Sequence, residues 1–540
     1  MKYKLLSIFT IFLPFLTFAQ DKGLDEKVND AFMPVAVWWE GLILTSIPIA
    51  GYNLPIVLIL LIFGATFFTI YFRFPNITRF GLAINTVRGK YDELDHHGVE
   101  KAELNIVDGD LVDTIADESK EGEVSHFQAL ATAVSGTVGL GNIAGVAVAI
   151  AIGGPGATFW MIVCGLIGMS TKFVECTLGV KYRDVGADGT VYGGPMYYLS
   201  RGLKQVGFTK LGKVLGVTFA ILCVGASFGG GNAFQSNQAA VQLSTMLNLQ
   251  GGATGVIIGV ILAILVGIVI IGGIKKIASV TEKIVPFMAG VYVLASLVII
   301  FANIEYIGDA FAMIFNGAFN PMAGLGGIVG VIIVGFQRAA FSNEAGAGSA
   351  AIAHSAVKTK YPASEGVVAL LEPFIDTVVI CTMTALVIIF FNMDTDAFQY
   401  GNAVNSTVLI TETGQYVGGV DLTSMAYDSV IPGFRYILTI AIILFAFSTM
   451  ISWSYYGLQS WKFLFGRGKY ADVVYKVLFL LFVVIGAGAT LDAVIKFSDA
   501  MILALVFPNM IGLLFLFPKV KEELNRYLQD IRGIKKQIDT

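Results

Sequence analysis

Charged residues are scarce in this chain. Only 14% of its 540 residues are Asp, Glu, Lys or Arg, whereas 56% are hydrophobic. A soluble domain carries about 25% charged residues, so the composition excludes an ordinary soluble protein and predicts a polytopic membrane protein. A basic patch with interleaved aromatic residues, which nucleic-acid binding needs, is also lacking.

Residues that could form metal sites, disulfides or enzyme active sites are few as well. The four histidines show no metal-ligand spacing, and the four cysteines fall in apolar segments, where we expect buried thiols and no disulfide framework. Residues 225–229 match a nucleophile elbow and residues 139–144 a dinucleotide fingerprint, but both lie in apolar segments without the strand that these motifs require. The sequence therefore predicts no enzyme, no transition-metal site and no organic cofactor. The cysteines are Cys164, Cys176, Cys223 and Cys381.

Long apolar segments dominate the rest of the chain. Eleven of them are long enough to cross a bilayer as helices. They lie near residues 55–72, 127–153, 157–181, 214–240, 253–273, 284–303, 327–353, 366–391, 433–457, 473–495 and 498–517.

Lys and Arg are missing from alternate connections between these spans. The segments 241–252, 304–326 and 392–432 contain none, whereas the other long connections and the tail 518–540 are basic. The positive-inside rule places the basic segments in the cytoplasm. We therefore expect a multi-pass protein of the plasma (inner) membrane, with its mature N-terminus outside and its C-terminus in the cytoplasm.

The segments outside the spans suggest a simple organisation. Residues 1–19 are typical of a signal peptide, with an uncleaved first helix as the alternative. Residues 20–90 would form an exported N-terminus and the first span, and residues 91–123 an acidic cytoplasmic insertion. The outer segment 392–432 is expected to form a strand pair or a lid.

Two spans are interrupted by glycine-rich stretches, at 135–142 (SGTVGLGN) and 341–348 (FSNEAGAG). Glycine inside a helix costs about 1 kcal/mol relative to alanine, and unwound backbone in lipid lacks hydrogen-bond partners. Such breaks are tolerated where the freed groups line a cavity, and a matched pair indicates the binding site of a secondary transporter. Close helix packing is the alternative explanation for the glycines.

The two breaks also divide the chain. With the first span set aside, each interrupted span opens a group of five, in residues 124–303 and 304–517. The two lead helices run in opposite directions across the membrane, which predicts an inverted repeat.

Several longer motifs resemble known transporters. Residues 139–142 (GLGN) and 153–157 (GGPGA) resemble the opening of the LeuT-type transporters. The stretches 125–145, 192–199, 231–237 and 340–349 resemble the alanine/glycine:cation symporter family, also called sodium:alanine symporters. The resemblance covers nearly all of 55–517 and implies an all-α, LeuT-like fold: a five-plus-five inverted repeat with one extra N-terminal transmembrane helix.

A zwitterionic amino acid needs two opposite partners at such a site. Its carboxylate suits the backbone N–H groups of the first break, and its ammonium suits acceptors in the second. The resemblance adds an aromatic and a polar side chain that would wall the cavity. The expected substrate-binding residues are Thr137, Gly139, Gly141, Asn142, Gln235, Phe341, Ser342, Asn343 and Trp453.

Oxygen ligands for a cation lie near the first break. Asn142 could offer its side-chain oxygen, with an inter-helix hydrogen bond as the alternative. The resemblance implies a sodium ion between carbonyls near Ser135 and Val138 and the hydroxyls of Ser448 and Thr449. Oxygen ligands suit a hard cation, although such hydroxyls often bond only to their own helix.

Ionisable residues at membrane depth are costly and rarely face lipid. We expect Glu344 to brace or gate the second break, with cation or proton binding as alternatives, and Arg338 to pair with it. The resemblance implies that Glu175 hydrogen-bonds the second unwound stretch. Glu372 and Asp376 are interpreted as polar residues at a helix end.

These observations predict a symporter that couples Na+ influx to uptake of a small neutral amino acid, alanine or glycine, by alternating access. Proton coupling is the alternative for the driving ion. A channel or a transporter-derived sensor is a second alternative, although no repeated filter motif is present and the tail is short. The sequence makes no prediction of oligomeric state.

Overall fold

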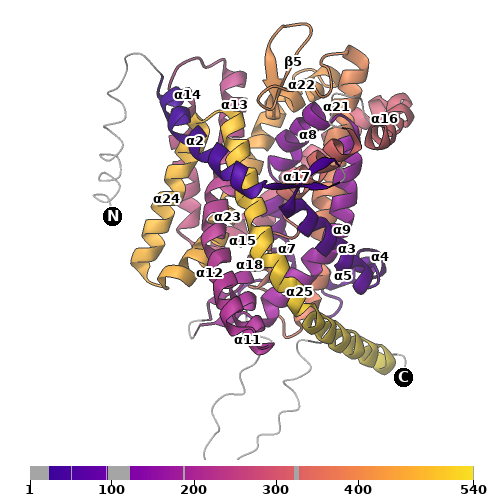
Figure 1. Cartoon of the computed structure of the whole chain (residues 1–540), viewed down its shortest axis with the longest axis vertical. Coiled ribbons are helices and arrows are strands. Elements are labelled where there is room, and N and C mark those ends of the chain that lie inside the picture. Colours follow the sequence, from indigo (N-terminus) through magenta and orange to yellow (C-terminus); the bar gives the residue numbers. More distant parts are fainter. Residues whose placement is uncertain are drawn as a thin grey trace, which may run out of the picture.

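The computed structural model describes residues 23–49, 51–92, 94, 122–186, 189–320 and 327–538. The predicted signal peptide and most of the acidic segment 91–123 lie outside these residues. The described part is a bundle of helices with three short two-stranded hairpins at its periphery (Figure 1).

The elements up to residue 302 contain the first predicted repeat and the segments before it. They are α2 (Leu24–Ile43), β1 (Ser46–Ile49), β2 (Tyr52–Pro55), α3 (Ile56–Tyr71), α4 (Pro75–Thr78), α5 (Phe80–Val87), α7 (His126–Thr137), η3 (Gly141–Gly145), α8 (Val146–Gly153), α9 (Gly156–Lys181), β3 (Asp184–Val185), β4 (Val191–Tyr192), α10 (Pro195–Tyr197), η4 (Tyr198–Gly202), α11 (Leu203–Gln205), α12 (Thr209–Phe228), η5 (Gly229–Ala233), α13 (Phe234–Leu247), α14 (Thr254–Ile270) and α15 (Gly273–Ala302).

The remaining elements contain the second predicted repeat and the C-terminal helix. They are η6 (Ile304–Tyr306), α16 (Ile307–Phe319), α17 (Gly327–Asn343), α18 (Ala351–His354), α19 (Pro362–Val368), α20 (Leu371–Pro373), η8 (Phe374–Cys381), α21 (Thr382–Thr395), β5 (Thr407–Leu409), β6 (Tyr416–Gly418), α22 (Val420–Val430), α23 (Phe434–Phe465), α24 (Lys469–Gly488) and α25 (Leu491–Ile538).

The apolar segments form helices as predicted. Among the described residues, seven helical segments are long and apolar enough to span a membrane, and α7 with η3 and α8 forms one more span that is bent by 49°. Three shorter apolar helices, α3, α14 and α17, coincide with the other predicted spans. Exposed Ile, Leu and Phe side chains along α14 and α15 suit contact with lipid chains.

Both predicted breaks are present, and the two broken helices run antiparallel. The first half of one, α7, contacts the second half of the other, α18, while α8 contacts α17. In Figure 1 the chain accordingly rises from α7 to α8 and descends from α17 to α18. The all-α fold with two oppositely directed lead helices is therefore the architecture that the sequence predicts.

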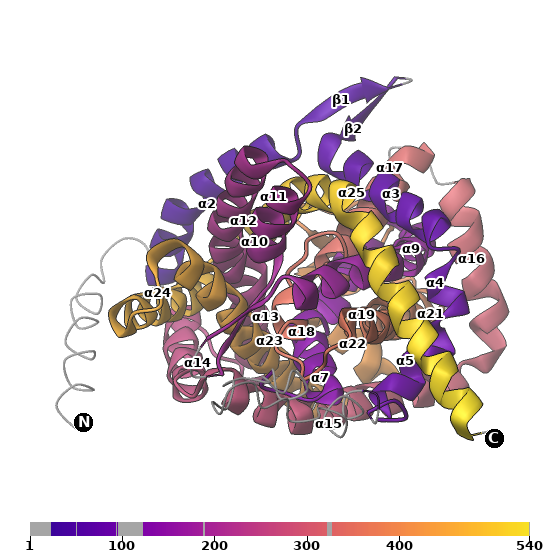
Figure 2. The ribbon, with the colours of Figure 1, turned by 90° about the horizontal axis from the view of Figure 1, so that it is seen from below.

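The two ends of the bundle differ. One end carries the β5–β6 hairpin and α22, so the strand pair predicted for 392–432 is present; we call this end the hairpin face. The opposite end carries α11 and the C-terminal part of α25, and we call it the basic face (Figure 2). The tail after residue 517 continues α25 as a helix.

The helix α2 was not predicted from the sequence. It packs along α25 near the hairpin face, where the rings of Phe32 and Phe497 lie 5.0 Å apart. The carboxylate of Asp25 accepts hydrogen bonds from the backbone N–H groups of Gly255 and Val256, both at 3.0 Å. An acidic side chain at a helix N-terminus is favourable, so α2 is held in place by capping α14.

Candidate functional site

The first break frees backbone N–H groups from the hydrogen bonds of the helix, and side-chain oxygens accept hydrogen bonds from these groups. Gly139 donates to Asn142 Oδ1 at 2.9 Å, and Leu140 donates to Gln235 Oε1 at 3.0 Å. Gln235 is held in turn by its own donation to the carbonyl of Gly230 at 2.9 Å. A carboxylate offers the same acceptor atoms with a full negative charge, so this stretch is suited to bind one.

The glycines around this break allow side chains from other helices to lie directly against the backbone. A Cβ atom on Gly139 would lie 2.4 Å from Thr449 Oγ1 and 3.1 Å from Gln235 Oε1. A Cβ on Gly231, in η5, would lie 2.1 Å from Trp453 Cγ. Any larger residue would have to displace these neighbours. The site is therefore tightly enclosed, as a small ligand requires.

The second break is unwound at Glu344, whose φ is 55°, and at Gly346, whose φ is 93°. The carboxylate of Glu344 accepts a hydrogen bond from the Ser349 hydroxyl, further along the break. It accepts a second one, at 3.0 Å, from Nε1 of Trp453 on α23. Left-handed backbone is unfavourable for a residue with a side chain, so these bonds help to hold Glu344 in it. The contacts join the break to the indole that lies against Gly231.

Glu175 on α9 contacts the second break directly. The backbone N–H of Gly346 donates to Glu175 Oε1 at 2.9 Å. Asn509 on α25 donates to the same oxygen at 2.7 Å and to the Gly346 carbonyl at 2.8 Å. Asn509 was not predicted, and its only sequence signal is a polar residue within an apolar span.

The residues expected to hold sodium between α7 and α23 meet in the structure. The Thr449 hydroxyl donates to the Ser135 carbonyl at 2.9 Å, and the Ser135 hydroxyl donates to the Ser448 carbonyl at 2.9 Å. Ser448 differs from the expectation, since its hydroxyl donates to Phe445 in its own helix at 3.0 Å. Val138 is fully buried at the C-terminal end of α7. The oxygen atoms offered here are thus mainly those of Ser135 and Thr449.

Asp376 joins both broken helices, and the interpretation of it as a helix-end residue is wrong. It lies fully buried within η8. Its carboxylate accepts a hydrogen bond of 2.7 Å from Nδ2 of Asn142, in the first break, and one of 2.8 Å from the hydroxyl of Ser342, in the second break. Thr377 also donates to it at 2.7 Å, and Asn343 donates to the Thr377 hydroxyl at 2.8 Å. A carboxylate in an apolar span was the signal that could have identified it.

Arg338 does not pair with Glu344. Its guanidinium forms an ion pair with Asp499 on α25, to which Gln337 also donates at 3.0 Å. The same guanidinium lies 5.6 Å from the ring centroid of Phe341. The expected pairing fails because the unwound backbone directs Glu344 towards α23, whereas Arg338, still in α17, faces α25.

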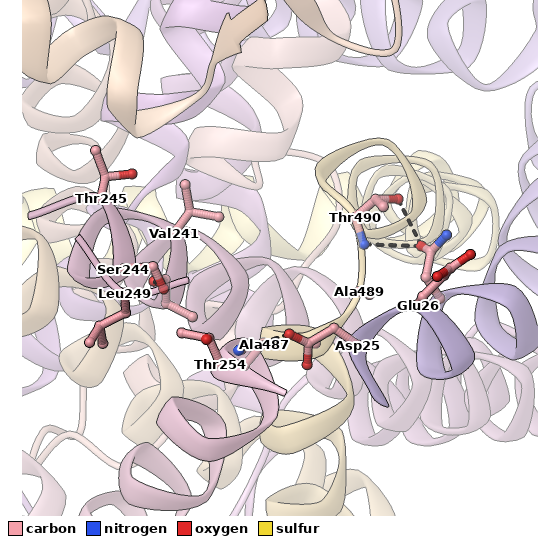
Figure 3. Close-up of a pocket in the computed structure, with 14 residues that line it drawn as sticks. Asp25, Glu26, Val241, Ser244, Thr245, Leu249, Thr254, Ala487, Ala489 and Thr490 are labelled. Atoms are coloured by element: carbon pink, nitrogen blue, oxygen red, sulfur yellow. Dashed lines mark hydrogen bonds between the residues drawn. The ribbon is translucent and has the colours of Figure 1, made fainter. Parts of the chain in front are cut away.

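One cavity lies away from the two breaks. It has a volume of about 480 Å³ and is lined by residues of α2, α13 and α14 and of the turn between α24 and α25 (Figure 3). Thr490 donates to Asn29 beside it through both its backbone N–H, at 3.0 Å, and its hydroxyl, at 2.8 Å. Among the described residues, no group of three His, Cys, Asp or Glu side chains could hold a metal ion.

Comparison with known proteins identifies the family. The model of the sodium:alanine symporter family matches residues 43–539, and the chain belongs to this family. The sodium/alanine symporter AgcS of Methanococcus maripaludis is 43% identical over 412 residues, which cover 76% of this chain and 86% of AgcS. An uncharacterized transporter of Haemophilus influenzae is 38% identical over 422 residues, covering 77% of this chain and 86% of that protein.

Among solved structures, that of MhsT in complex with L-phenylalanine matches with a TM-score of 0.49 and 14% identity. The match covers 74% of this chain and 99% of MhsT. Family membership confirms the predicted resemblance: the chain is a multi-pass membrane transporter of the amino-acid:cation symporter class and not an enzyme.

Proposed function

We propose that this protein couples Na+ influx to uptake of a small neutral amino acid, alanine or glycine, across the inner membrane. The observation that carries the proposal is the meeting of both broken helices at Asp376, where Asn142 and Ser342 donate to one buried carboxylate. A cation or an amino acid bound at this junction would contact both halves of the protein at once. Ligands at such a junction can bias alternating access.

The amino-acid carboxylate would bind at the N–H groups of Gly139 and Leu140 and displace the oxygens of Asn142 and Gln235 that now accept them. Thr137 and Gly141 flank these groups. The ammonium would bind to acceptors of the second break, which Phe341, Ser342 and Asn343 provide. The indole of Trp453 and the ring of Phe341 would limit the length of the substrate side chain.

Sodium would bind at two places in this arrangement. One is between α7 and α23, with the Ser135 carbonyl and the Thr449 hydroxyl as ligands and Val138 and Ser448 nearby. The other is at Asp376, where Na+ would take the place of hydrogen-bond donors and the oxygen of Asn142 would turn towards the ion. Oxygen donors, one of them a carboxylate, suit a hard cation.

Four ionisable residues would support or gate the site. Glu175 and Glu344 hold the second break to α9 and α23. The Arg338–Asp499 pair joins α17 to α25 and would close the site towards the hairpin face. In the proposed orientation the hairpin face and the mature N-terminus are outside, residues 1–19 are a cleaved signal peptide, and the basic face is cytoplasmic.

Uptake of labelled alanine into proteoliposomes tests this function. An inward Na+ gradient should drive accumulation, and replacement of external Na+ by choline or K+ should abolish it. Equal uptake in choline would refute Na+ coupling, and uptake that collapses with a protonophore while ignoring Na+ would indicate proton coupling. Competition by unlabelled amino acids, with and without Na+, would show which side chains the site accepts. Binding of alanine without flux would instead support a sensor.

A further inference from the structure

A buried row of histidine and glutamate side chains lies between the broken helices and the basic face. It starts with His126 at the first residue of α7, and Glu365 in α19 contacts Nδ1 of both His126 and His354 in α18. Beyond His354, Glu372 in α20 forms an ion pair with Lys172 on α9 at 3.1 Å. We call these residues, from His126 to Lys172, the histidine latch.

The latch has a single partly exposed member. The side chain of His126 is 11% exposed, whereas those of Glu365, His354, Glu372 and Lys172 are fully buried. His126 is also the first residue of α7, and this end of α7 lies at the basic face (Figure 2). A proton that reaches the interior of the latch from this face can therefore pass through His126 and Glu365.

The latch joins the ends of the two broken helices where their backbones are also joined. Before α7, Glu123 N donates to the Ala356 carbonyl at 2.7 Å, and after α18, Lys358 N donates to the Val124 carbonyl at 2.9 Å. Separation of α7 from α18 would have to break both these bonds and the contacts of Glu365. The latch is thus placed to control opening of the basic face.

The second ring nitrogen of His354 faces a carboxylate oxygen of Glu372. His354 Nε2 lies 3.5 Å from Glu372 Oε2. Within the described residues, neither atom has a hydrogen-bond partner. A proton on Nε2 allows the imidazolium to donate towards both carboxylates, whereas without it a lone pair faces a carboxylate oxygen. Buried polar atoms without partners are unfavourable, so this geometry favours the protonated form.

The balance of charge within the latch also favours the protonated form of His354. With His354 protonated, its charge and that of Lys172 compensate the carboxylates of Glu365 and Glu372. Loss of the proton leaves Lys172 as the one fully buried cation of the latch beside two buried carboxylates, so one carboxylate charge then depends on the partly exposed His126, which is unfavourable. Water can stabilise that charge only if the latch opens.

Other ionisable groups also face the latch. Glu175 and Cys176 on α9, Glu344 in the second break and Tyr456 on α23 interact electrostatically with Lys172 or Glu372. None of these four groups carries positive charge. Among the groups named here, compensation therefore depends on Lys172, His354 and the partly exposed His126.

We infer that the histidine latch binds one proton at His354, which keeps α7 against α18, and that release of this proton to the basic side favours opening there. The inference rests on alternating access in the proposed function and adds a regulatory proton site, separate from the site at Asp376. At acidic pH on the basic side the closed state is favoured, and opening increases as the pH rises.

Maleimide labelling of a cysteine on α7 measures opening without requiring transport. We would place Ala129→Cys, a fully buried position, in a chain whose four native cysteines are replaced by alanine. Labelling would be followed from about pH 5.5 to 8, where histidine titrates, and corrected for thiolate formation with the unfolded chain. The corrected rate should rise with pH, by at most about tenfold per unit, which is the limit for one linked proton.

Charge-matched variants make the test specific. His354→Gln should label fast at every pH, because the carboxylates stay uncompensated. Adding Glu372→Gln removes the excess charge, so the double variant should label slowly and without pH dependence. His97→Gln, which removes a histidine of the acidic segment, should behave like the parent.

A parent chain whose corrected rate does not change with pH would overturn the inference. So would a His354→Gln chain that keeps the parental pH profile, or a double variant that labels as fast as the single one. If His354→Gln does not fold, the parent profile and the double variant still decide. Absence of Na+-driven alanine uptake with the expected labelling pattern would refute the proposed function and leave the proton site standing.

Discussion

Replacement of Asp376 by asparagine tests the site most directly. The substitution keeps the size of the side chain and removes its charge. Asp376 accepts three hydrogen bonds, from Asn142 at 2.7 Å, Ser342 at 2.8 Å and Thr377 at 2.7 Å. Asparagine has one oxygen that can accept hydrogen bonds, and an NH2 group stands where aspartate has its second oxygen. At least one of these donors therefore loses its acceptor.

The size of the effect follows from these bonds. A hydrogen bond to a charged group contributes about 1.5–3 kcal/mol, against about 1 kcal/mol for a neutral one. The charge of Asp376 therefore contributes about 0.5–2 kcal/mol to each of its three partners, or about 1.5–6 kcal/mol together. Na+ that replaces such donors must gain at least as much from the carboxylate. Loss of this free energy corresponds to a Na+ affinity that is weaker by roughly 10- to 30,000-fold.

The assay is the Na+ dependence of alanine binding to purified protein, measured by calorimetry. Asp376→Asn should raise the half-saturating Na+ concentration by the factor given above, with a thermal melt that shows a folded protein. Asp421→Asn is the matched control, because this half-buried aspartate lies in α22 at the hairpin face, where it accepts a hydrogen bond from the Thr245 hydroxyl at 3.2 Å. A half-saturating Na+ concentration within twofold of the parent value would refute a cation site at Asp376.

Three further substitutions give distinct outcomes. Gly231→Ala should abolish uptake, because its Cβ would lie 2.1 Å from Cγ of the Trp453 indole on α23. Gly290→Ala is the control and should transport normally, because its Cβ would point into open space. Equal loss of uptake in both variants would contradict the steric argument. Thr449→Val should raise the half-saturating Na+ concentration for uptake about tenfold, as expected for one lost oxygen ligand, and no change would exclude its hydroxyl as a ligand. Asp499→Asn leaves Arg338 buried without its counter-ion and should lower stability by about 3–5 kcal/mol in denaturant unfolding, a loss that a double variant with Arg338→Met should largely reverse.

Local chemistry made much of the fold predictable. The apolar segments had to form helices because a bilayer offers no partners to backbone groups, and glycines in two of them marked where those helices end. Gly139 and Gly346 indeed lie in unwound stretches. The alternation of basic and non-basic connections indicated that the two lead helices run in opposite directions, and the contacts of α7 with α18 and of α8 with α17 agree.

Side-chain partners were much less predictable. Asp376 lies 234 residues from Asn142, and Asn509 lies 334 residues from Glu175, so no spacing in the sequence relates them. Arg338 and Glu344 are near neighbours in the chain, yet the break between α17 and α18 turns them towards different helices. Such contacts depend on how each helix is rotated about its axis.

The sequence by itself determined which segments are buried in lipid, where two of them break and to which transporter family the chain belongs, because hydrophobicity and glycine act locally. Only the tertiary structure decided that both breaks converge on Asp376, that Arg338 faces Asp499 and that two histidines share Glu365. The physical reason is that a buried charge needs a partner in space, and that partner is provided by the lateral packing of helices far apart in the chain.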